Sequence, residues 1–99
     1  MKKRLKLIET VVGRKTVESG GYVYTYTLIK RESRRISSFR IPLYSIKIEL
    51  SNPAGEKTEA LSHDLFSDLG KAIVFYDRLV RNLATPIDLA YVVEDEILR

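Results

Sequence analysis

The sequence predicts an α+β domain, in which an antiparallel three- to four-stranded β-meander carries two C-terminal α-helices packed on one face. Two observations support this prediction. The first half of the chain has β-branched and aromatic residues in runs that turn signals separate, as strands do. The second half has apolar residues at steps of three and four, the spacing of an amphipathic helix. The 99 residues suit a single domain, 1–99.

Three segments of the first half have the composition of strands, at about 4–12, 21–31 and 38–51. Valine, isoleucine, threonine and tyrosine are frequent in them, and these side chains fit a pleated surface. In the third segment apolar and polar residues alternate, which predicts a sheet with one wet face at this strand. The apolar side is Tyr44, Ile46, Ile48 and Leu50, and the polar side is Ser45, Lys47 and Glu49.

Turn signals separate these segments and indicate a fourth strand. Residues 13–21 end in Gly20-Gly21, which can supply positive φ, and the polar run 31–37 suits a hairpin tip. Asn52-Pro53-Ala54-Gly55 fits a type I turn, because proline presets φ at the second position. We therefore expect the chain to return after this turn as a short fourth strand at 56–63.

The first of the two expected helices spans about 67–84. Ser67, with Asp68 directly after it, is a candidate N-cap, and Ser62 is the alternative. Pro86 disfavours the α conformation for the residue before it, so this helix should end near Ala84. Its apolar residues recur at helical spacing: Leu65, Leu69, Ala72, Ile73, Tyr76, Leu79, Val80 and Leu83.

The second helix is expected at about 86–98. Thr85 suits its N-cap, and proline in the first turn has no N–H that the helix would need. Asp88 lies near the positive end of the helix dipole. The apolar stripe of this helix is Leu89, Val92, Val93 and Ile97.

The stretch TPIDLAYVVEDEI (85–97) resembles the C-terminal pattern of a small uncharacterised family of Gram-positive bacterial proteins. Members of that family similarly begin with strands that contain tyrosine and end in two helices. The resemblance covers mainly residues 67–98, and residues 22–50 more loosely, and it implies the same fold. The family pattern commonly has histidine where Asp88 stands here. The family has no established activity, so the resemblance implies no chemistry.

The stretch YVYTYTLIKRESRRISSFR (22–40) has two interpretations. Tyr22, Tyr24 and Tyr26 share one side of a strand, and aromatic faces can stack bases. If the first strand pairs antiparallel with the second, the basic residues at the start of the first lie near the basic residues at the end of the second. Such side chains neutralise phosphates. The structural interpretation, which we favour, is a half-buried tyrosine layer and a solubilising hairpin tip. The basic residues concerned are Lys2, Lys3, Arg4, Lys6, Lys30, Arg31, Arg34, Arg35 and Arg40.

Charge is divided unequally between the two halves. Residues 1–50 carry 12 basic and 4 acidic side chains, whereas residues 51–99 carry 5 and 9. This division could mark a surface that binds polyanions. It could equally draw the two halves together, or two copies of the chain, through the acidic second helix.

Candidates for catalysis or metal binding are few. His63 and Asp64 are neighbours on an expected strand and so point apart, and no third group completes a nucleophile or base arrangement. Glu94, Asp95 and Glu96 lie about 100° apart around a helix and cannot converge on a cation. The glycines match neither phosphate-binding motif, and the chain has no cysteine. We therefore expect no catalysis, no metal site and no cofactor.

These observations predict a small cytoplasmic protein that is not an enzyme. We expect a protein-interaction or regulatory module, whose partner is another protein or a second copy. The alternative is a weak nucleic-acid-binding protein that uses the basic tip and the tyrosine strand. No run approaches the ~20 apolar residues of a membrane span, and charges interrupt the N-terminus before a signal-peptide core forms.

Overall fold

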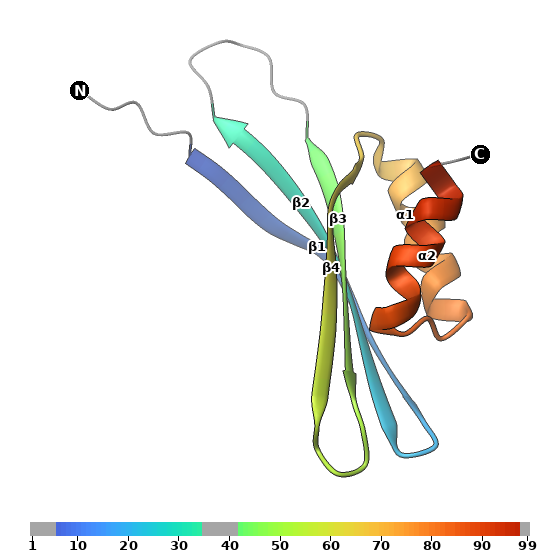
Figure 1. Cartoon of the computed structure of the whole chain (residues 1–99). Helices are drawn as coiled ribbons and strands as arrows, with labels where there is room; N and C mark the ends of the chain where they lie inside the picture. Colours follow the sequence, from blue (N-terminus) through green and yellow to red (C-terminus); the bar gives the residue numbers. More distant parts are fainter. Residues whose placement is uncertain (1–5, 35–41, 98–99) are drawn as a thin grey trace.

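A computed structural model describes residues 6–34 and 42–97. Four strands form one antiparallel sheet in the order β1-β2-β3-β4, and two helices follow and pack against it (Figure 1). The predicted α+β architecture is confirmed, including the fourth strand. The elements are β1 (Lys6–Ser19), β2 (Tyr22–Arg34), β3 (Leu43–Ser51), β4 (Lys57–Phe66), α1 (Leu69–Arg81) and α2 (Pro86–Ile97).

Strands β1 and β2 are longer than the sequence predicted. The register shifts between Val11 and Gly13, so Val12 is an extra residue in a β-bulge and β1 continues to Ser19. Gly20 and Gly21, with φ of 59° and 83°, then form the turn that glycine allows.

The polar run 31–37 was predicted as a hairpin tip, and this prediction is wrong for its first four residues. Strand β2 continues to Arg34 because residues 6–9 of β1 pair with residues 31–34 of β2. The paired first strand therefore overrides the turn preference of these polar residues.

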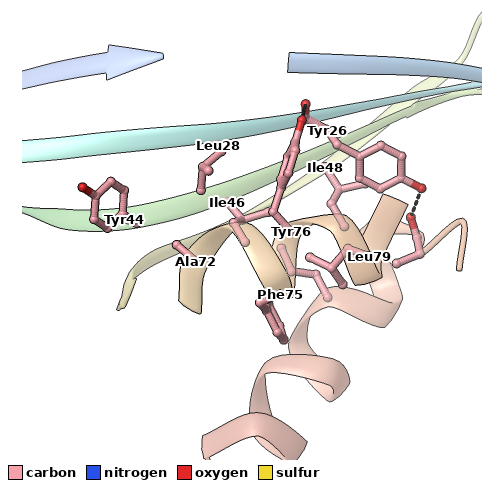
Figure 2. Close-up of a cluster of buried hydrophobic side chains, with 11 residues drawn as sticks. Tyr26, Leu28, Tyr44, Ile46, Ile48, Ala72, Phe75, Tyr76 and Leu79 are labelled. Atoms are coloured by element: carbon pink, nitrogen blue, oxygen red, sulfur yellow. Dashed lines mark hydrogen bonds between the residues drawn. The ribbon is translucent and has the colours of Figure 1, made fainter. Parts of the chain in front are cut away.

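The core lies between one face of the sheet and the two helices (Figure 2). Alternate residues of the central strands supply the sheet side, as predicted for Tyr44, Ile46 and Ile48 of β3. The predicted wet face of this strand is wrong at Ser45, which is fully buried. Side chains of β2 and β3 meet α1 and α2 in a single cluster that is at most 5% exposed: Tyr26, Leu28, Tyr44, Ile46, Ile48, Ala72, Phe75, Tyr76, Leu79, Ala84 and Leu89.

Helix α1 is shorter than predicted at both ends. It begins after Asp68, whose carboxylate accepts a hydrogen bond of 2.9 Å from the backbone N–H of Gly70. It ends at Arg81, because Leu83 adopts a left-handed φ of 49°. The N–H of Leu83 then bonds to Val80, and the N–H of residue 84 bonds back to the carbonyl of residue 79. This Schellman-type turn ends the helix before the proline restricts it.

Helix α2 begins with Thr85 as its N-cap, as the sequence predicted, and Asp88 adds a second hydrogen bond that was not predicted. The backbone N–H of Asp88 donates to Thr85 Oγ1 over 3.2 Å, and the N–H of Thr85 donates to Asp88 Oδ2 over 3.0 Å. This is a reciprocal capping box. Of the predicted apolar stripe, Leu89 is buried, whereas Ile97 at the far end is 68% exposed, so the predicted stripe is wrong at that residue.

Candidate interaction surface

The tyrosine stripe of β2 lies on the side of the sheet that the helices cover. Tyr26 is fully buried, and its hydroxyl donates a hydrogen bond of 2.9 Å to the carbonyl oxygen of Ala84. Tyr76 of α1 donates in turn to the backbone carbonyl of Tyr26 over 2.8 Å (Figure 2). Tyr24 is half-buried and parallel to Tyr26, with ring centroids 6.3 Å apart, and Tyr22 is 42% exposed. Tyr26 and Tyr24 therefore belong to the core or pack against it, where bases could not stack on them, and Tyr22 is the one exposed ring of the stripe.

The two buried tyrosine hydroxyls act as structural donors. Burial raises the pKa of Tyr26 to about 12, and the nearby Tyr24 and Asp88 add smaller contributions. Burial also raises the pKa of Tyr76, with a smaller contribution from Asp77. Both hydroxyls consequently stay protonated near neutral pH, where they are suited to donating hydrogen bonds and not to general base catalysis.

The structure describes four of the nine predicted basic residues. Lys6 and Arg34 are register partners, so antiparallel pairing brings the start of β1 to the end of β2 as predicted. Lys30 Nζ lies 2.8 Å from Glu32 Oε1, and the hydrogen bond and charge of Glu32 raise the pKa of Lys30. The other five lie outside the described residues: Lys2, Lys3, Arg4, Arg35 and Arg40.

Arg31, the fourth, is enclosed by groups from β1 and β4. Its Nη1 lies 2.8 Å from Nδ1 of His63 and 3.5 Å from Oδ1 of Asp64. Its Nε lies 3.1 Å from Oε2 of Glu9, an ion pair without a well-directed hydrogen bond. Since a guanidinium only donates, His63 Nδ1 accepts in this contact. With its side chain 18% exposed and held by three groups, Arg31 is a poor ligand for a phosphate.

The sequence did not predict that His63 and Asp64 would converge on one side chain. Neighbours on a regular strand point apart, but Asp64 has a φ of 54° at an irregularity in the β3–β4 register. Its backbone N–H donates to Oγ of the fully buried Ser45 over 2.9 Å. The local sequence gives one indication of this irregularity: aspartate adopts the left-handed backbone conformation more readily than most residues do.

The outer surface of α2 combines exposed apolar and acidic side chains. Ile87 and Tyr91, one turn apart, are 78% and 68% exposed. Asp88, Glu94 and Asp95 are exposed beside them, and the helix PIDLAYVVEDEI contains no lysine or arginine. We call these five residues the acidic-apolar face of α2. The sequence indicated that the acidic residues of this helix do not converge on a cation. The exposed apolar residues Ile87 and Tyr91 were not predicted, because they lie outside the predicted apolar stripe of the helix.

A groove opens between the start of α1 and the end of α2. Its volume is about 450 Å³, and an ion pair of 3.0 Å between Arg78 and Glu96 crosses it from one helix to the other. The Arg78 guanidinium also lies 5.2 Å from the centre of the Phe75 ring. These contacts engage Arg78 and Glu96, and Asp68 accepts the hydrogen bond from Gly70, so the groove presents apolar surface beside the exposed Lys71. Its lining is Phe66, Asp68, Gly70, Lys71, Val74, Phe75, Arg78 and Glu96.

Among residues 6–34 and 42–97, no three histidine, aspartate or glutamate side chains gather in a way that could hold a metal ion. No helix within those ranges has the length and apolar character needed to cross a bilayer.

Comparison with known proteins places the chain in a family. A family model described as a family of unknown function (DUF6514) matches residues 7–99. No curated protein matches the chain, and no solved structure does. The order of the elements, strands followed by two C-terminal helices, agrees with the resemblance found in the sequence. The chain therefore belongs to DUF6514, a family of unknown function.

Proposed function

We propose that this protein is a non-catalytic, cytoplasmic protein-interaction module that binds a basic and apolar segment of a partner protein through the acidic-apolar face of α2. The observation that carries the proposal is the exposure of Ile87 and Tyr91, 78% and 68%, on a helix whose only charged residues are acidic. Exposed apolar side chains rimmed by charge are typical of protein-binding surfaces.

The two kinds of side chain have different roles in this proposal. Tyr91 supplies a large apolar ring with a polar hydroxyl, a combination that is enriched at interaction hot spots. Ile87 extends the apolar contact by one helical turn. The carboxylates of Asp88, Glu94 and Asp95 favour a basic partner and accelerate its encounter.

The predicted basic surface is a weaker candidate. Arg31 is held by Glu9, Asp64 and His63, and Lys30 is paired with Glu32. Binding a partner through Lys30 or Arg31 would require breaking these contacts, whereas Ile87 and Tyr91 of α2 are exposed and can be covered without such a loss.

The test uses a probe of the proposed chemistry: an amphipathic helical peptide of about 18 residues, composed of leucine and lysine. Titrated into the ¹⁵N-labelled protein, it should shift the amide signals of residues 87–95. The double substitution Ile87→Ser with Tyr91→Ser should weaken binding at least tenfold, and added salt should weaken it further.

Two controls make the test specific. Val74→Ser with Leu61→Ser removes two other exposed apolar side chains, 65% and 44% exposed, and should leave the affinity unchanged. A peptide in which glutamate replaces lysine should not bind. Equal affinity of the Ile87/Tyr91 double variant, or shifts confined to the opposite face of the sheet, would refute the proposal.

A further inference from the structure

Among the strands that the structure describes, β1 is an edge of the sheet, and we propose that it pairs in antiparallel fashion with β1 of a second copy, centred on Thr16. It comes first in the strand order, so its outer main-chain groups have no strand beside them within the described chain. An edge with unsatisfied N–H and C=O groups is a template for pairing with another strand. Helix α1 packs over β2, β3 and β4, and α2 packs over β3 and β4 (Figure 1). Helix α1 reaches β1 through the side chain of Lys15, whose Nζ lies 3.2 Å from Asp77 Oδ1 on the covered face of the sheet, so the outer main-chain edge of β1 is not part of this contact.

The regular part of β1 sets where such a pairing is centred. Above Gly13 the bulge at Val12 interrupts the strand, and below Ser19 the turn begins. Between them, residues 13–19 pair with β2 in unbroken register. Thr16 is the middle of this segment. An antiparallel pairing of two copies that uses the whole segment therefore places Thr16 opposite Thr16.

The charges along the same segment select that register independently. With Thr16 at the centre, Arg14 of each copy lies opposite Glu18 of the other. Both side chains are exposed and lie on the sheet face away from the helices, as their alternation with the inward-facing Lys15 and Val17 requires. Neither has an ion-pair partner among the side chains that the structure describes.

Other registers lose this complementarity. If the centre moves to Lys15, Arg14 lies opposite Thr16, and if it moves to Val17, Glu18 lies opposite Thr16. Opposite charges directly across two strands stabilise their pairing, and like charges destabilise it. The twofold symmetry of the dimer forms the Arg14–Glu18 pair twice.

A pairing of this length predicts a weak dimer. Seven residues on each side form a smaller contact than the roughly 1,600 Å² of a standard stable interface. We expect dissociation constants on the order of 10–100 μM, which correspond to association free energies of about −7 to −5.5 kcal/mol. The inference concerns β1 alone and does not depend on the proposed function of α2.

The experiment is a charge swap, read by sedimentation velocity of the whole chain from about 5 μM to 1 mM. The wild type should shift from monomer to dimer over this range. Glu18→Lys should weaken dimerisation at least tenfold, because the introduced ammonium would face Arg14 of the other copy, and Arg14→Glu should do the same by placing two carboxylates opposite each other. The double variant Arg14→Glu with Glu18→Arg should restore the wild-type association, which a folding defect could not do.

The possible outcomes distinguish pairing through β1 from the alternatives. Restoration by the double variant, with slower amide hydrogen exchange in residues 13–19 at high concentration, supports the pairing. A wild type that stays monomeric at 1 mM overturns it, as does a Glu18→Lys variant that dimerises like the wild type. Dimerisation that survives Glu18→Lys but is lost in the Ile87/Tyr91 double variant would assign self-association to α2 instead.

Discussion

The hydroxyl of Tyr26 donates a hydrogen bond to the carbonyl oxygen of Ala84, 2.9 Å away, and so joins the middle of β2 to the turn between the two helices. Because Ala84 lies in the Schellman-type turn that ends α1, this bond also helps to place the start of α2. The bond is buried, so its loss leaves a carbonyl that water does not readily reach.

The first prediction concerns this bond. Tyr26→Phe should lower the free energy of unfolding by about 1–2 kcal/mol, the typical cost of leaving a buried acceptor without its donor. Urea denaturation followed by circular dichroism measures the change. Tyr22→Phe is the matched control, because Tyr22 is 42% exposed, and it should change stability by less than about 0.5 kcal/mol. Equal effects of both substitutions would contradict the assigned role of Tyr26.

The second prediction concerns alkaline pH. The pKa of Tyr26 is about 12 in the folded state and 10.0 as the ordinary value, so the folded state holds this proton more tightly. The contribution of this proton to the free energy of unfolding is complete below pH 10 and is lost as pH rises from 10 towards 12. The full loss is on the order of 2–3 kcal/mol.

This loss is best measured as a difference between two proteins, since lysines also titrate in this range. The stability advantage of the wild type over Tyr26→Phe, taken from urea unfolding, should be constant from pH 7 to 9 and shrink between pH 10 and 11.5. An advantage that grows with pH would show that the sign is wrong.

The third prediction concerns Arg31 of β2, whose guanidinium contacts side chains of β1 and β4. Arg31→Ala should destabilise the fold by about 1–2 kcal/mol, because it removes the contacts to Glu9, Asp64 and His63 at once. Arg31→Lys should not restore stability, since one ammonium cannot reproduce the planar fork. Lys57→Ala, at an exposed basic residue of β4, is the control and should be nearly neutral. Thermal unfolding of the four proteins in parallel provides the comparison.

The fourth prediction concerns the start of α2. Thr85→Ala and Asp88→Ala should each cost about 1 kcal/mol, because each removes one half of the capping box. Together they should cost less than the sum of the two, since the two halves act as a unit. Asp95→Ala, at an exposed carboxylate of the same helix, should be close to neutral. Strict additivity in this double-mutant cycle would argue against the reciprocal arrangement.

The kind and order of the elements follow from the amino-acid sequence, because they depend on local chemistry. The alternation of residues 44–50 fixes which side of β3 is apolar, and the pattern Thr85-Pro86-Ile87-Asp88 begins a helix wherever it stands in the fold. Local preference was less reliable at boundaries. Polar residues at the end of β2 and before Ser19 in β1 became strand because a neighbouring strand was there to pair with them.

Which side of the sheet the helices cover depends on how the whole chain packs, and this packing determines whether the tyrosine stripe is core or surface. The sequence around Tyr24 and Tyr26 is compatible with two positions. On an open face of the sheet bases could reach the two rings, whereas under the helices the rings are part of the core or pack against it. In the same way, one irregularity at Asp64 brought His63 and Asp64 onto Arg31, although the two acceptors lie more than thirty residues further along the chain. Such contacts depend on register and on backbone turns between distant segments, which no local pattern specifies.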